Sequence, residues 1–412
     1  MLLRARTVLP MCAPPVENGA VLVSGAHIQQ VGPWNELRLE PGQPVVDLGE
    51  SILLPGLINA HCHLDYTDMA GKLSPAKNFS DWIKAIVALK AAWSYTEYAN
   101  SWVNGAHMLL HSGTTTVVDI EAVPELLSDA TTSTPLRVTS CLELLSVRSR
   151  ERAFELVDAA ARLLHARTIE ACGLSPHAPY STSPELLRAA VAIARRNQWL
   201  LTMHVAESAD EFDMYRNGRG AMFEWLKAQR DMGDCDGRSP VQHLAQCDVL
   251  GPKTLAVHAN YLVDQDAELL ARSGTSVVHC PRSHAYFGHE KFEFEKLDAA
   301  GVNICLGTDS MASVAKSHAE PLALSMFSEM RVLESHYPGL SPRRILETAT
   351  VNAARALGCA GVLGVIHPGA RADLIAVPGA TARNELYEAV LQHRADVLAS
   401  MVRGEWAVAP SI

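Results

Sequence analysis

The sequence predicts an α/β protein: a (β/α)8 TIM barrel with a small β-sandwich domain formed by the N- and C-terminal segments. Short apolar runs alternate with longer segments of helical period, and we count eight such runs between residues 57 and 310. Both ends of the chain lack the helical segments. Strands that alternate with helices favour a parallel sheet, and a count of eight favours closure into a barrel. A doubly wound sheet is the main alternative, but it requires no such count.

Residues 1–55 are the first part of the chain without helical period. Their apolar runs are separated by Gly and Pro, as in β-hairpins. The C-terminal segments 371–379 and 396–410 are of the same kind. We therefore expect residues 1–55 and 360–412 to pair into one small β-domain, beside a barrel that spans residues 56–359.

The barrel strands are expected where the apolar β-rich runs lie. The runs are 57–64, 114–120, 136–145, 169–177, 200–207, 254–262, 276–281 and 302–310. Helices are expected between them, for example over 151–166 and 183–197. Ser183 and Pro184 open the second of these helices as an N-cap residue followed by proline at the first helical position.

The composition is that of a globular chain, with 412 residues, 48% of them hydrophobic and 19% charged. The formal net charge is -10, and the sequence has no block of like charges, so it does not predict binding to nucleic acid or to an anionic membrane. This charge suits a small-molecule partner better. The N-terminal apolar runs are short and are broken by Pro10 and Pro14. We therefore expect no secretory or membrane-spanning segment and a cytoplasmic protein. Oligomeric state stays open, with a homodimer as the common default.

Titratable residues recur where the predicted strands end. The chemistry of a (β/α)8 barrel lies at the C-terminal ends of its strands, so residues at these positions should share one mouth. The residues concerned are His61 and His63 (first strand), His177 (fourth), His204 and Glu207 (fifth), His258 (sixth) and Asp309 (eighth).

The pattern of histidines predicts a metal site. His61 and His63 are two residues apart, so both side chains project from the same face of a strand. A catalytic zinc ion takes three protein ligands and a water, sometimes with one ligand more. His204 supplies a third nitrogen and Asp309 an oxygen. An H-x-H pair alone is a weak signal that also fits core histidines, but further candidates at the other strand ends favour a metal.

Glu207 lies three residues after His204, which strict strand alternation would place on the opposite face. We therefore expect the strand to end or bulge between them and to carry Glu207 over the mouth. A carboxylate beside an activated water is a candidate proton carrier, and the alternative is a surface glutamate that opens the next helix. With Asp309 as proton acceptor and His258 stabilising developing charge, the set predicts hydrolytic attack on an electrophilic sp2 carbon.

The motifs, taken in order, resemble those of the amidohydrolase superfamily. They are "PGLINAHCHL", "MHVAE", "AVHANYL", "HCPRS", "LGTDS", "TVNAARALG" and "PGARADLIAV", which together extend from Pro55 to Val377. They look most like the branch of cytosine deaminase, guanine deaminase, the adenosylhomocysteine and methylthioadenosine deaminases, and the triazine chlorohydrolases. The resemblance implies one divalent metal ion, zinc first, with iron or manganese as alternatives. It also implies the metal ligands His61, His63, His204 and Asp309 and the catalytic residues Glu207, His258 and Asp309.

Two kinds of residue pattern are absent from the sequence, and their absence limits the classes of reaction that the site could catalyse. Binuclear members of the superfamily bridge two metals with a carboxylated lysine at the third or fourth strand, and no lysine lies between Lys90 and Lys227. The nine cysteines include no C-x-x-C pair, which argues against a disulfide framework and against the unrelated zinc deaminases. We therefore expect a deaminase acting on an amino-substituted nitrogen heterocycle, of purine or adenosine type. Hydrolytic dechlorination or cyclic amide hydrolysis at the same site is the alternative, and a non-catalytic binding protein is a remote one.

Four residues are candidates for substrate contact. His177 matches a histidine that contacts substrate in the nucleoside-deaminating relatives. Arg282 and His284 follow the seventh strand, His284 standing where asparagine is common, and a guanidinium there favours an anionic substrate group. The alternative is that Arg282 pairs with an acidic neighbour such as Glu290. Trp82 is a candidate to stack on a flat ring, with core or lid packing as its alternative.

Overall fold

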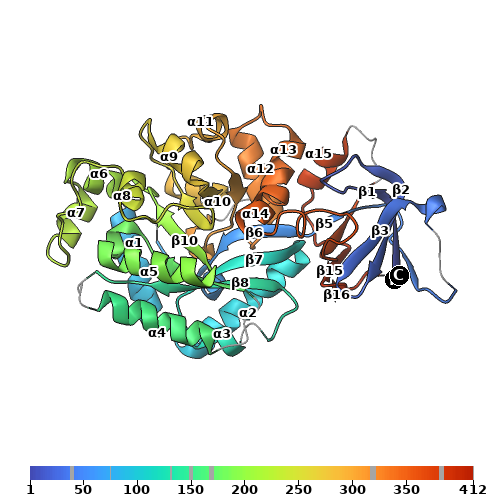
Figure 1. The fold of residues 1–412 in the computed structure, drawn as a ribbon, viewed down its shortest axis with the longest axis horizontal. Coiled ribbons are helices and arrows are strands. Elements are labelled where there is room, and N and C mark those ends of the chain that lie inside the picture. The colour runs from blue at the N-terminus through green and yellow to red at the C-terminus, as the bar shows by residue number, and fades with distance from the viewer. Residues whose placement is uncertain are drawn as a thin grey trace.

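The computed structural model describes residues 1–37, 41–74, 76–129, 132–147, 152–166, 171–315, 322–379 and 385–411. A barrel surrounded by helices makes up most of the molecule, and a second sheet lies at one end of it (Figure 1). The blue N-terminal strands and the red C-terminal strands lie side by side in that second sheet. No helix in the described ranges is both long and apolar enough to cross a membrane.

Eight parallel strands form the barrel, as predicted, and each pairs with its neighbours in chain order. They are β6 (Leu57–Cys62), β7 (Thr114–Glu121), β8 (Arg137–Leu144), β9 (Ala171–Pro176), β10 (Leu200–Val205), β11 (Thr254–His258), β12 (Ser276–His279) and β13 (Ile304–Leu306). Residues 169 and 170 of the predicted fourth strand lie outside the described residues. Most strands end earlier than their apolar runs, so the residues that follow are free to turn over the mouth.

The α-helices lie between and after these strands. They are α1 (Phe79–Ala91), α2 (Tyr95–His111), α3 (Leu126–Asp129), α4 (Ala153–His165), α5 (Pro184–Asn197), α6 (Ala209–Asn217), α7 (Ala221–Leu226), α8 (Pro240–Gln246), α9 (Asp266–Ser273), α10 (Pro281–Phe287), α11 (Phe294–Ala299), α12 (Met326–His336), α13 (Pro342–Thr348), α14 (Val351–Ala356) and α15 (Leu386–Leu391). The predicted helix over 183–197 is confirmed, with the Ser183 side chain accepting a hydrogen bond from Leu186 N. The helix predicted over 151–166 is α4, and residue 151 lies outside the described residues.

The second sheet joins the two ends of the chain. Its strands are β1 (Leu2–Val8), β2 (Val16–Ser24), β3 (His27–Pro33), β4 (Val45–Asp47), β5 (Ser51–Pro55), β14 (Leu374–Pro378), β15 (Ala399–Val402) and β16 (Glu405–Val408). Strand β14 pairs antiparallel with β5, which confirms that the ends fold together. Because β5 is separated from the first barrel strand by Gly56 alone, the sheet fixes where that strand begins.

The barrel closes between its first and last strands, β6 and β13. Cys62 and Asp309 form a parallel bridge, and the backbone N–H groups of Thr308 and Asp309 donate to the carbonyl of His61 at 3.0 and 3.1 Å. A Cβ atom at Gly307 would lie 2.7 Å from the same carbonyl oxygen, so only glycine permits this approach. The closure therefore brings Asp309 beside the histidines of β6.

Candidate active site

The predicted metal ligands meet at the mouth of the barrel. His61, His63, His204 and Asp309 each offer one ligand atom, and these atoms all lie within 4.8 Å of one another. Asp309 Oδ1 lies 3.5 Å from His61 Nε2 and 3.7 Å from His63 Nε2. His63 Nε2 and His204 Nε2 are 3.4 Å apart. All four side chains are buried, so the cluster is a closed group of three imidazoles and one carboxylate.

Neighbouring side chains orient Asp309. Its Oδ2 atom accepts hydrogen bonds from the hydroxyls of Ser283 at 2.6 Å and Ser313 at 3.0 Å. These two bonds leave Oδ1 facing the histidines. Asp309 itself has φ of +54°, a left-handed conformation that is strained for a non-glycine residue. The backbone strain and the two hydroxyls together fix one carboxylate oxygen in the cluster.

The donor atoms of the cluster fit a divalent metal ion. Both ring nitrogens of His61 are buried without a hydrogen-bond partner among the described residues. The Nδ1–H group of His204 donates to the carbonyl of His177 at 2.8 Å, so its Nε2 presents a lone pair to the other ligands. Burial lowers the pKa of His63 to about 3 and that of His204 well below its usual value. The imidazoles of His63 and His204 are therefore neutral, which is the form that binds metals.

Glu207 reaches the mouth by the turn that the sequence predicts. Strand β10 ends at Val205, and Ala206 has φ of +50°, which turns the chain between His204 and Glu207. Glu207 Oε1 then lies 3.5 Å from His258 Nε2. Burial, with Asp309 and Glu211 nearby, raises the pKa of Glu207 well above its usual value. The Glu207 carboxyl is thus suited to hold a proton at neutral pH.

His258 ends strand β11 with φ of +74°, and Ala259 follows with φ of +50°. Burial lowers the pKa of His258 to about 3, so its imidazole is neutral. Its Nε2 atom is buried without a hydrogen-bond partner among the described residues. Strained backbone at Ala206, His258, Ala259 and Asp309 lies at the ends of three strands around one mouth, which is typical of functional sites.

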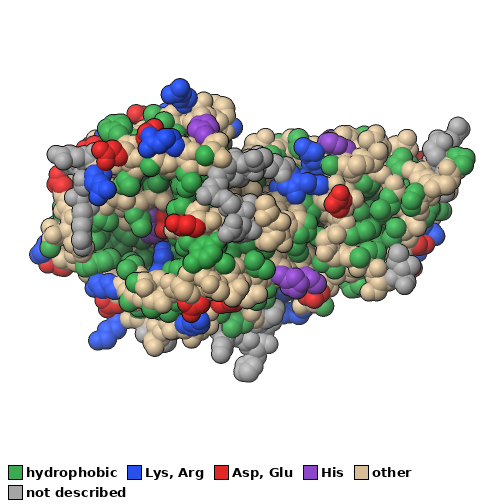
Figure 2. Space-filling model, turned by 90° about the horizontal axis from the view of Figure 1, so that it is seen from below, with side chains coloured by type: hydrophobic (Ala, Val, Ile, Leu, Met, Phe, Trp, Pro, Cys, Tyr) green, Lys and Arg blue, Asp and Glu red, His purple; other side chains and the backbone are tan. Residues whose placement is uncertain are grey.

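A cavity of about 250 Å³ opens beside the cluster. Hydrophobic side chains surround a hollow, with histidine and charged side chains at its floor, on the face seen in Figure 2. The cavity is lined by His63, His204, Glu207 and Asp309 at one end and by Trp82, Ile83, Ile86, Val87, Leu145, Val147 and Trp225 among its apolar residues. The cluster thus faces a mainly apolar space that suits a flat ring.

Two of the four predicted substrate residues line this cavity. His177 does so, and its Nδ1 atom lies 2.7 Å from the hydroxyl of Ser181. Trp82 also lines the cavity, with its ring held edge to face by Phe287 at 4.9 Å between centroids. Both side chains therefore lie in the wall of the cavity, where a bound substrate would contact them.

Arg282 and His284 are not among the described residues that line the cavity. Helix α10 begins at Pro281, and the backbone N–H of Arg282 donates to Glu329 of α12 at 2.9 Å. Its guanidinium donates to the carbonyl of Ala323, just before α12, at 2.7 Å. His284 Nε2 instead donates to the carbonyl of Glu290 at 2.8 Å. The structure does not support the expected anion contact by Arg282, and its acidic neighbour is Glu329 rather than Glu290.

Two charged residues of the cavity were missed by the sequence analysis. Glu143 lies near the end of β8, and Lys90 in α1 lies 3.7 Å from it. Glu143 follows the strand-end rule that identified the histidines, within the predicted run 136–145. A sequence signal therefore existed for Glu143, whereas nothing in the pattern of α1 distinguishes Lys90 from a surface lysine.

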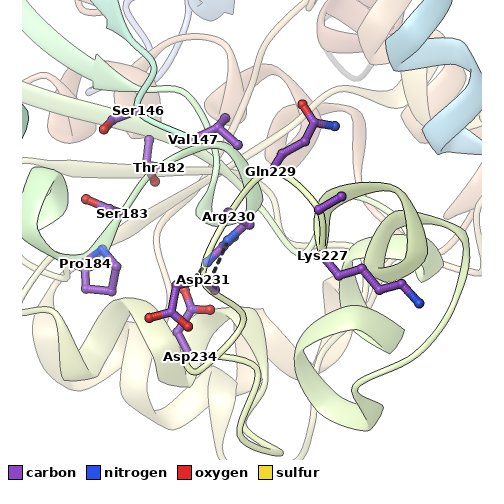
Figure 3. A pocket seen from close by; sticks show the side chains of 11 residues that line it. Ser146, Val147, Thr182, Ser183, Pro184, Lys227, Gln229, Arg230, Asp231 and Asp234 are labelled. Atoms are coloured by element: carbon purple, nitrogen blue, oxygen red, sulfur yellow. Dashed lines mark hydrogen bonds and ion pairs between the residues drawn. The ribbon is translucent and has the colours of Figure 1, made fainter. Parts of the chain in front are cut away.

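A second cavity, of about 410 Å³, adjoins the first and shares Val147 and Gln229 with it (Figure 3). Figure 3 shows Arg230 beside Asp234 at its base, and an ion pair joins these side chains. Arg230 also donates to the carbonyl of Pro179 at 3.1 Å and to the Tyr215 hydroxyl at 3.2 Å. Several polar contacts therefore hold Arg230 in the lining of the second cavity.

The fold and the cluster of histidines and aspartate together define a barrel hydrolase of the metal-dependent kind. Comparison with known protein families matches residues 52–407 to the Amidohydrolase family. The chain belongs to this family.

Relatives of this chain carry the names of deaminases. The chain is 30% identical over 377 residues to a 5-methylthioadenosine/S-adenosylhomocysteine deaminase of Syntrophobacter fumaroxidans, with 87% of this chain and 80% of the relative covered. It is 29% identical to the aminodeoxyfutalosine deaminase of Deinococcus radiodurans, with 82% and 81% covered. The fold is similar to that of an adenosine deaminase from Xanthomonas campestris with bound zinc, at 24% identity and a TM-score of 0.81, with 98% of this chain and 92% of that chain covered.

Proposed function

We propose that this protein is a mononuclear metal-dependent aminohydrolase that removes the amino group from an adenosine-type nucleoside or a related purine as ammonia. The observation that carries the proposal is the metal-binding cluster set beside the Glu207–His258 pair, with both facing one mainly apolar cavity. The names of the relatives support an adenosine-type substrate.

Four residues hold the metal ion in this proposal: His61, His63, His204 and Asp309. Neutral imidazole and carboxylate ligands suit zinc, and the zinc of the Xanthomonas campestris structure favours it here over iron or manganese. When bound, the ion acts as a Lewis acid that lowers the pKa of water, so that a nucleophile is available near neutral pH. The hydroxyls of Ser283 and Ser313 and the carbonyl of His177 hold two of the ligands in place.

Three residues move or hold protons. Asp309 Oδ1, which the serine hydroxyls leave free, accepts a proton from the attacking water. His258 Nε2 orients that water and stabilises the charge that develops on its oxygen. Glu207 donates its proton to the ring nitrogen next to the reacting carbon. It then takes the proton of the added hydroxyl group as the ring carbonyl forms and gives it to the departing amine. The proton held by Asp309 returns to Glu207 through solvent, which restores both residues. Water adds to the carbon, the C–N bond breaks, and ammonia and a ring carbonyl remain.

His177 and Trp82 contact the substrate in this proposal. Trp82 presents an aromatic surface to the cavity and is fixed from behind by Phe287, so it can stack on a purine ring without loss of side-chain freedom. His177 lies next to the ligand His204, with 4.8 Å between ring centroids. It is therefore placed to donate a hydrogen bond close to the reacting carbon.

An ammonia-release assay tests the proposal. Zinc-loaded protein is incubated with adenosine, 5-methylthioadenosine, S-adenosylhomocysteine, adenine, cytosine, guanine and the chlorinated triazine atrazine, and ammonia and chloride are both measured. We expect ammonia from at least one adenosine-type compound. Release of chloride from atrazine with no ammonia from any purine would contradict the proposal and favour dechlorination.

A pair of histidine variants tests the metal ligands independently of the substrate. His61→Ala should lose both bound zinc and activity, as measured by elemental analysis and ammonia release. His279 is the matched control, because it is also a buried barrel histidine but its ring stacks on Phe292 at 4.0 Å. His279→Phe should keep its zinc. Stoichiometric zinc in His61→Ala would overturn the ligand assignment.

A further inference from the structure

Lys90 and Glu143 form a charged pair in the wall of an otherwise mainly apolar cavity. Lys90 Nζ lies 3.7 Å from Glu143 Oε2, and the two side chains are 26% and 5% exposed. Among the described residues that line the cavity, Lys90 is the only lysine or arginine. Burying such a pair costs desolvation energy that apolar residues of similar size would avoid. Because a charged pair beside the reaction centre is less favourable for folding than apolar residues would be, its presence indicates a role in binding.

The pair is connected to the metal ligands by stacked side chains. The ring of Tyr66 lies parallel to that of His63, with 5.1 Å between centroids, and Lys90 Nζ lies 4.7 Å from the centre of the Tyr66 ring. Lys90 is therefore two contacts away from a metal ligand. A substrate whose reacting carbon lies at the metal reaches the pair with another part of its structure.

Glu143 is ionised in this position. Burial alone would raise its pKa, but the positive charge of Lys90, 3.7 Å away, holds the pKa below its usual value. The pair thus presents a carboxylate acceptor and an ammonium donor side by side. Lys90 has three N–H groups, so one directed at Glu143 leaves others for a ligand.

The charges around the cavity decide which kind of ligand group the pair accepts. Glu143, Glu207 and Asp309 all line it, whereas Lys90 is already compensated by Glu143. An anionic substituent would lose its hydration and, beside Lys90, meet the ionised Glu143. A neutral group that carries a donor and an acceptor can bond to both members of the pair without separating them. A hydroxyl group or a ring lactam has this chemistry.

We infer that Lys90 and Glu143 determine substrate specificity by binding one neutral group that accepts a hydrogen bond from Lys90 and donates one to Glu143. The group is a hydroxyl of a sugar substituent or the lactam edge of a ring, and a carboxylate is disfavoured. The inference rests on the proposed function only for the placement of the reacting ring at the metal. It replaces Arg282 with Lys90 as the cation of the site and reverses the expected preference for an anion.

Equilibrium binding to the zinc-loaded protein tests the inference without any need for turnover. The probes are purine, purine riboside, 2′,3′-dideoxy purine riboside, the 5′-carboxylate of purine riboside, and 8-oxopurine, each titrated by calorimetry. We expect at least tenfold tighter binding of purine riboside than of its dideoxy form if the group is a hydroxyl. Tenfold tighter binding of 8-oxopurine than of purine would identify the lactam, because the N7–H and C8=O groups lie on the edge of the ring away from the reacting carbon.

Variants of the pair decide whether it causes the preference. Lys90→Met and Glu143→Gln should each remove the preference, and Lys90→Arg should keep most of it. The double variant K90M/E143L removes both charges together, so it leaves no unpaired buried charge and guards against misfolding of a single variant. Lys291 and Glu295 form the control pair, because they are exposed and do not line this cavity. K291M and E295Q should bind every probe as the wild type does.

The inference and the proposed function fail in different ways. No ammonia from any purine, with the preference present and dependent on the pair, would overturn only the function. A preference that survives in both Lys90→Met and the double variant would overturn the inference. So would tighter binding of the 5′-carboxylate than of purine riboside, or no binding of any probe that carries a hydroxyl or lactam.

Discussion

Glu207 reaches the barrel mouth because one residue, Ala206, turns the chain at the end of strand β10. Replacing Glu207 with Gln removes the ionisable carboxyl proton but keeps the size of the side chain. We expect Glu207→Gln to bind zinc normally and to lose about 10²- to 10⁴-fold in kcat, the range that general acid–base groups contribute. Steady-state ammonia release and elemental analysis measure the two quantities. A variant with full kcat would remove Glu207 from the proton path.

Arg282 has a structural role at the back of the site. Its guanidinium lies 3.9 Å from the carboxylate of the fully buried Glu329 and donates to the carbonyl of Ala323, so Arg282→Ala would remove both contacts. We expect a loss of about 3 kcal/mol in unfolding free energy with little change in KM. The double variant R282M/E329Q should recover most of this loss. Urea unfolding and steady-state kinetics are the measurements. A raised KM for anionic substrates alone, at unchanged stability, would restore the prediction made from sequence.

The sequence could predict the position of individual side chains where that position depends only on the end of a strand. His61, His63, His204, Glu207 and Asp309 could be placed because each follows an apolar run, and runs in a barrel end at one mouth. Arg282 could not, because the direction of its side chain depends on where α10 begins relative to α12. Nor could Lys90, because its partner Glu143 lies far along the chain on another element.

Strands β6 and β13 hold the site together through Asn59. Its Nδ2 atom donates to the Thr308 hydroxyl at 2.8 Å, and its Oδ1 atom accepts from the backbone N–H groups of Thr308 at 3.1 Å and His61 at 3.3 Å. Asn59→Leu would leave these buried N–H groups without the Asn59 acceptor. We expect a loss of about 3 kcal/mol in unfolding free energy. Zinc affinity should also fall, because His61 and Asp309 are positioned by the same closure.

Asn303 provides the matched control for Asn59. It lies just before β13, at the end of the strand away from the site, and its Nδ2 atom donates to the Ser276 hydroxyl and to the carbonyl of Asn352, both at 3.0 Å. Asn303→Ala should lower stability and leave zinc affinity unchanged. Equal loss of affinity in both variants would show that the effect of Asn59 is general destabilisation. Competition with a chromogenic chelator measures the affinities.

At the level of elements, the eight barrel strands could be predicted because buried parallel strands are continuous apolar runs. The residues at which these strands end could not be predicted. The run 254–262 continues through Tyr261, yet strand β11 ends at His258, where the backbone turns left-handed. Hydrophobicity does not distinguish a buried strand from a buried turn, so the pattern extends the strand into the residues that form the site.

The molecule as a whole depends on its two ends meeting. Gly and Pro turns predicted hairpins in both terminal segments, and these segments were expected to pair into one β-domain. The structure shows that the pairing joins β5 with β14. The pairing places β5 directly before β6, and β6 carries His61. The order of strands in the sheet could not be predicted, because backbone hydrogen bonds at strand edges carry little sequence information.

Buried carboxyl groups near the site give the whole molecule a pH-dependent stability. Glu211 is fully buried and accepts a hydrogen bond from the backbone N–H of Glu207 at 2.9 Å. Burial raises its pKa to about 8 from an ordinary value of 4.5. Between these values the folded protein holds a proton that the unfolded chain releases, so the unfolding free energy falls as pH rises. The shift corresponds to a loss of unfolding free energy on the order of 5 kcal/mol, and this loss is complete above about pH 8.

Glu211→Gln should therefore flatten the pH dependence of stability. The amide oxygen can still accept from Glu207 N, but the side chain no longer ionises, so the variant avoids the loss that the wild type suffers between about pH 5 and pH 8. Urea unfolding across this range measures the slope, and the advantage of the variant should grow with pH. Glu268, exposed on α9, is the control, and Glu268→Gln should follow the wild type. Parallel curves for wild type and Glu211→Gln would mean that Glu211 is ionised in the folded protein, held by cations or hydrogen bonds rather than penalised by burial.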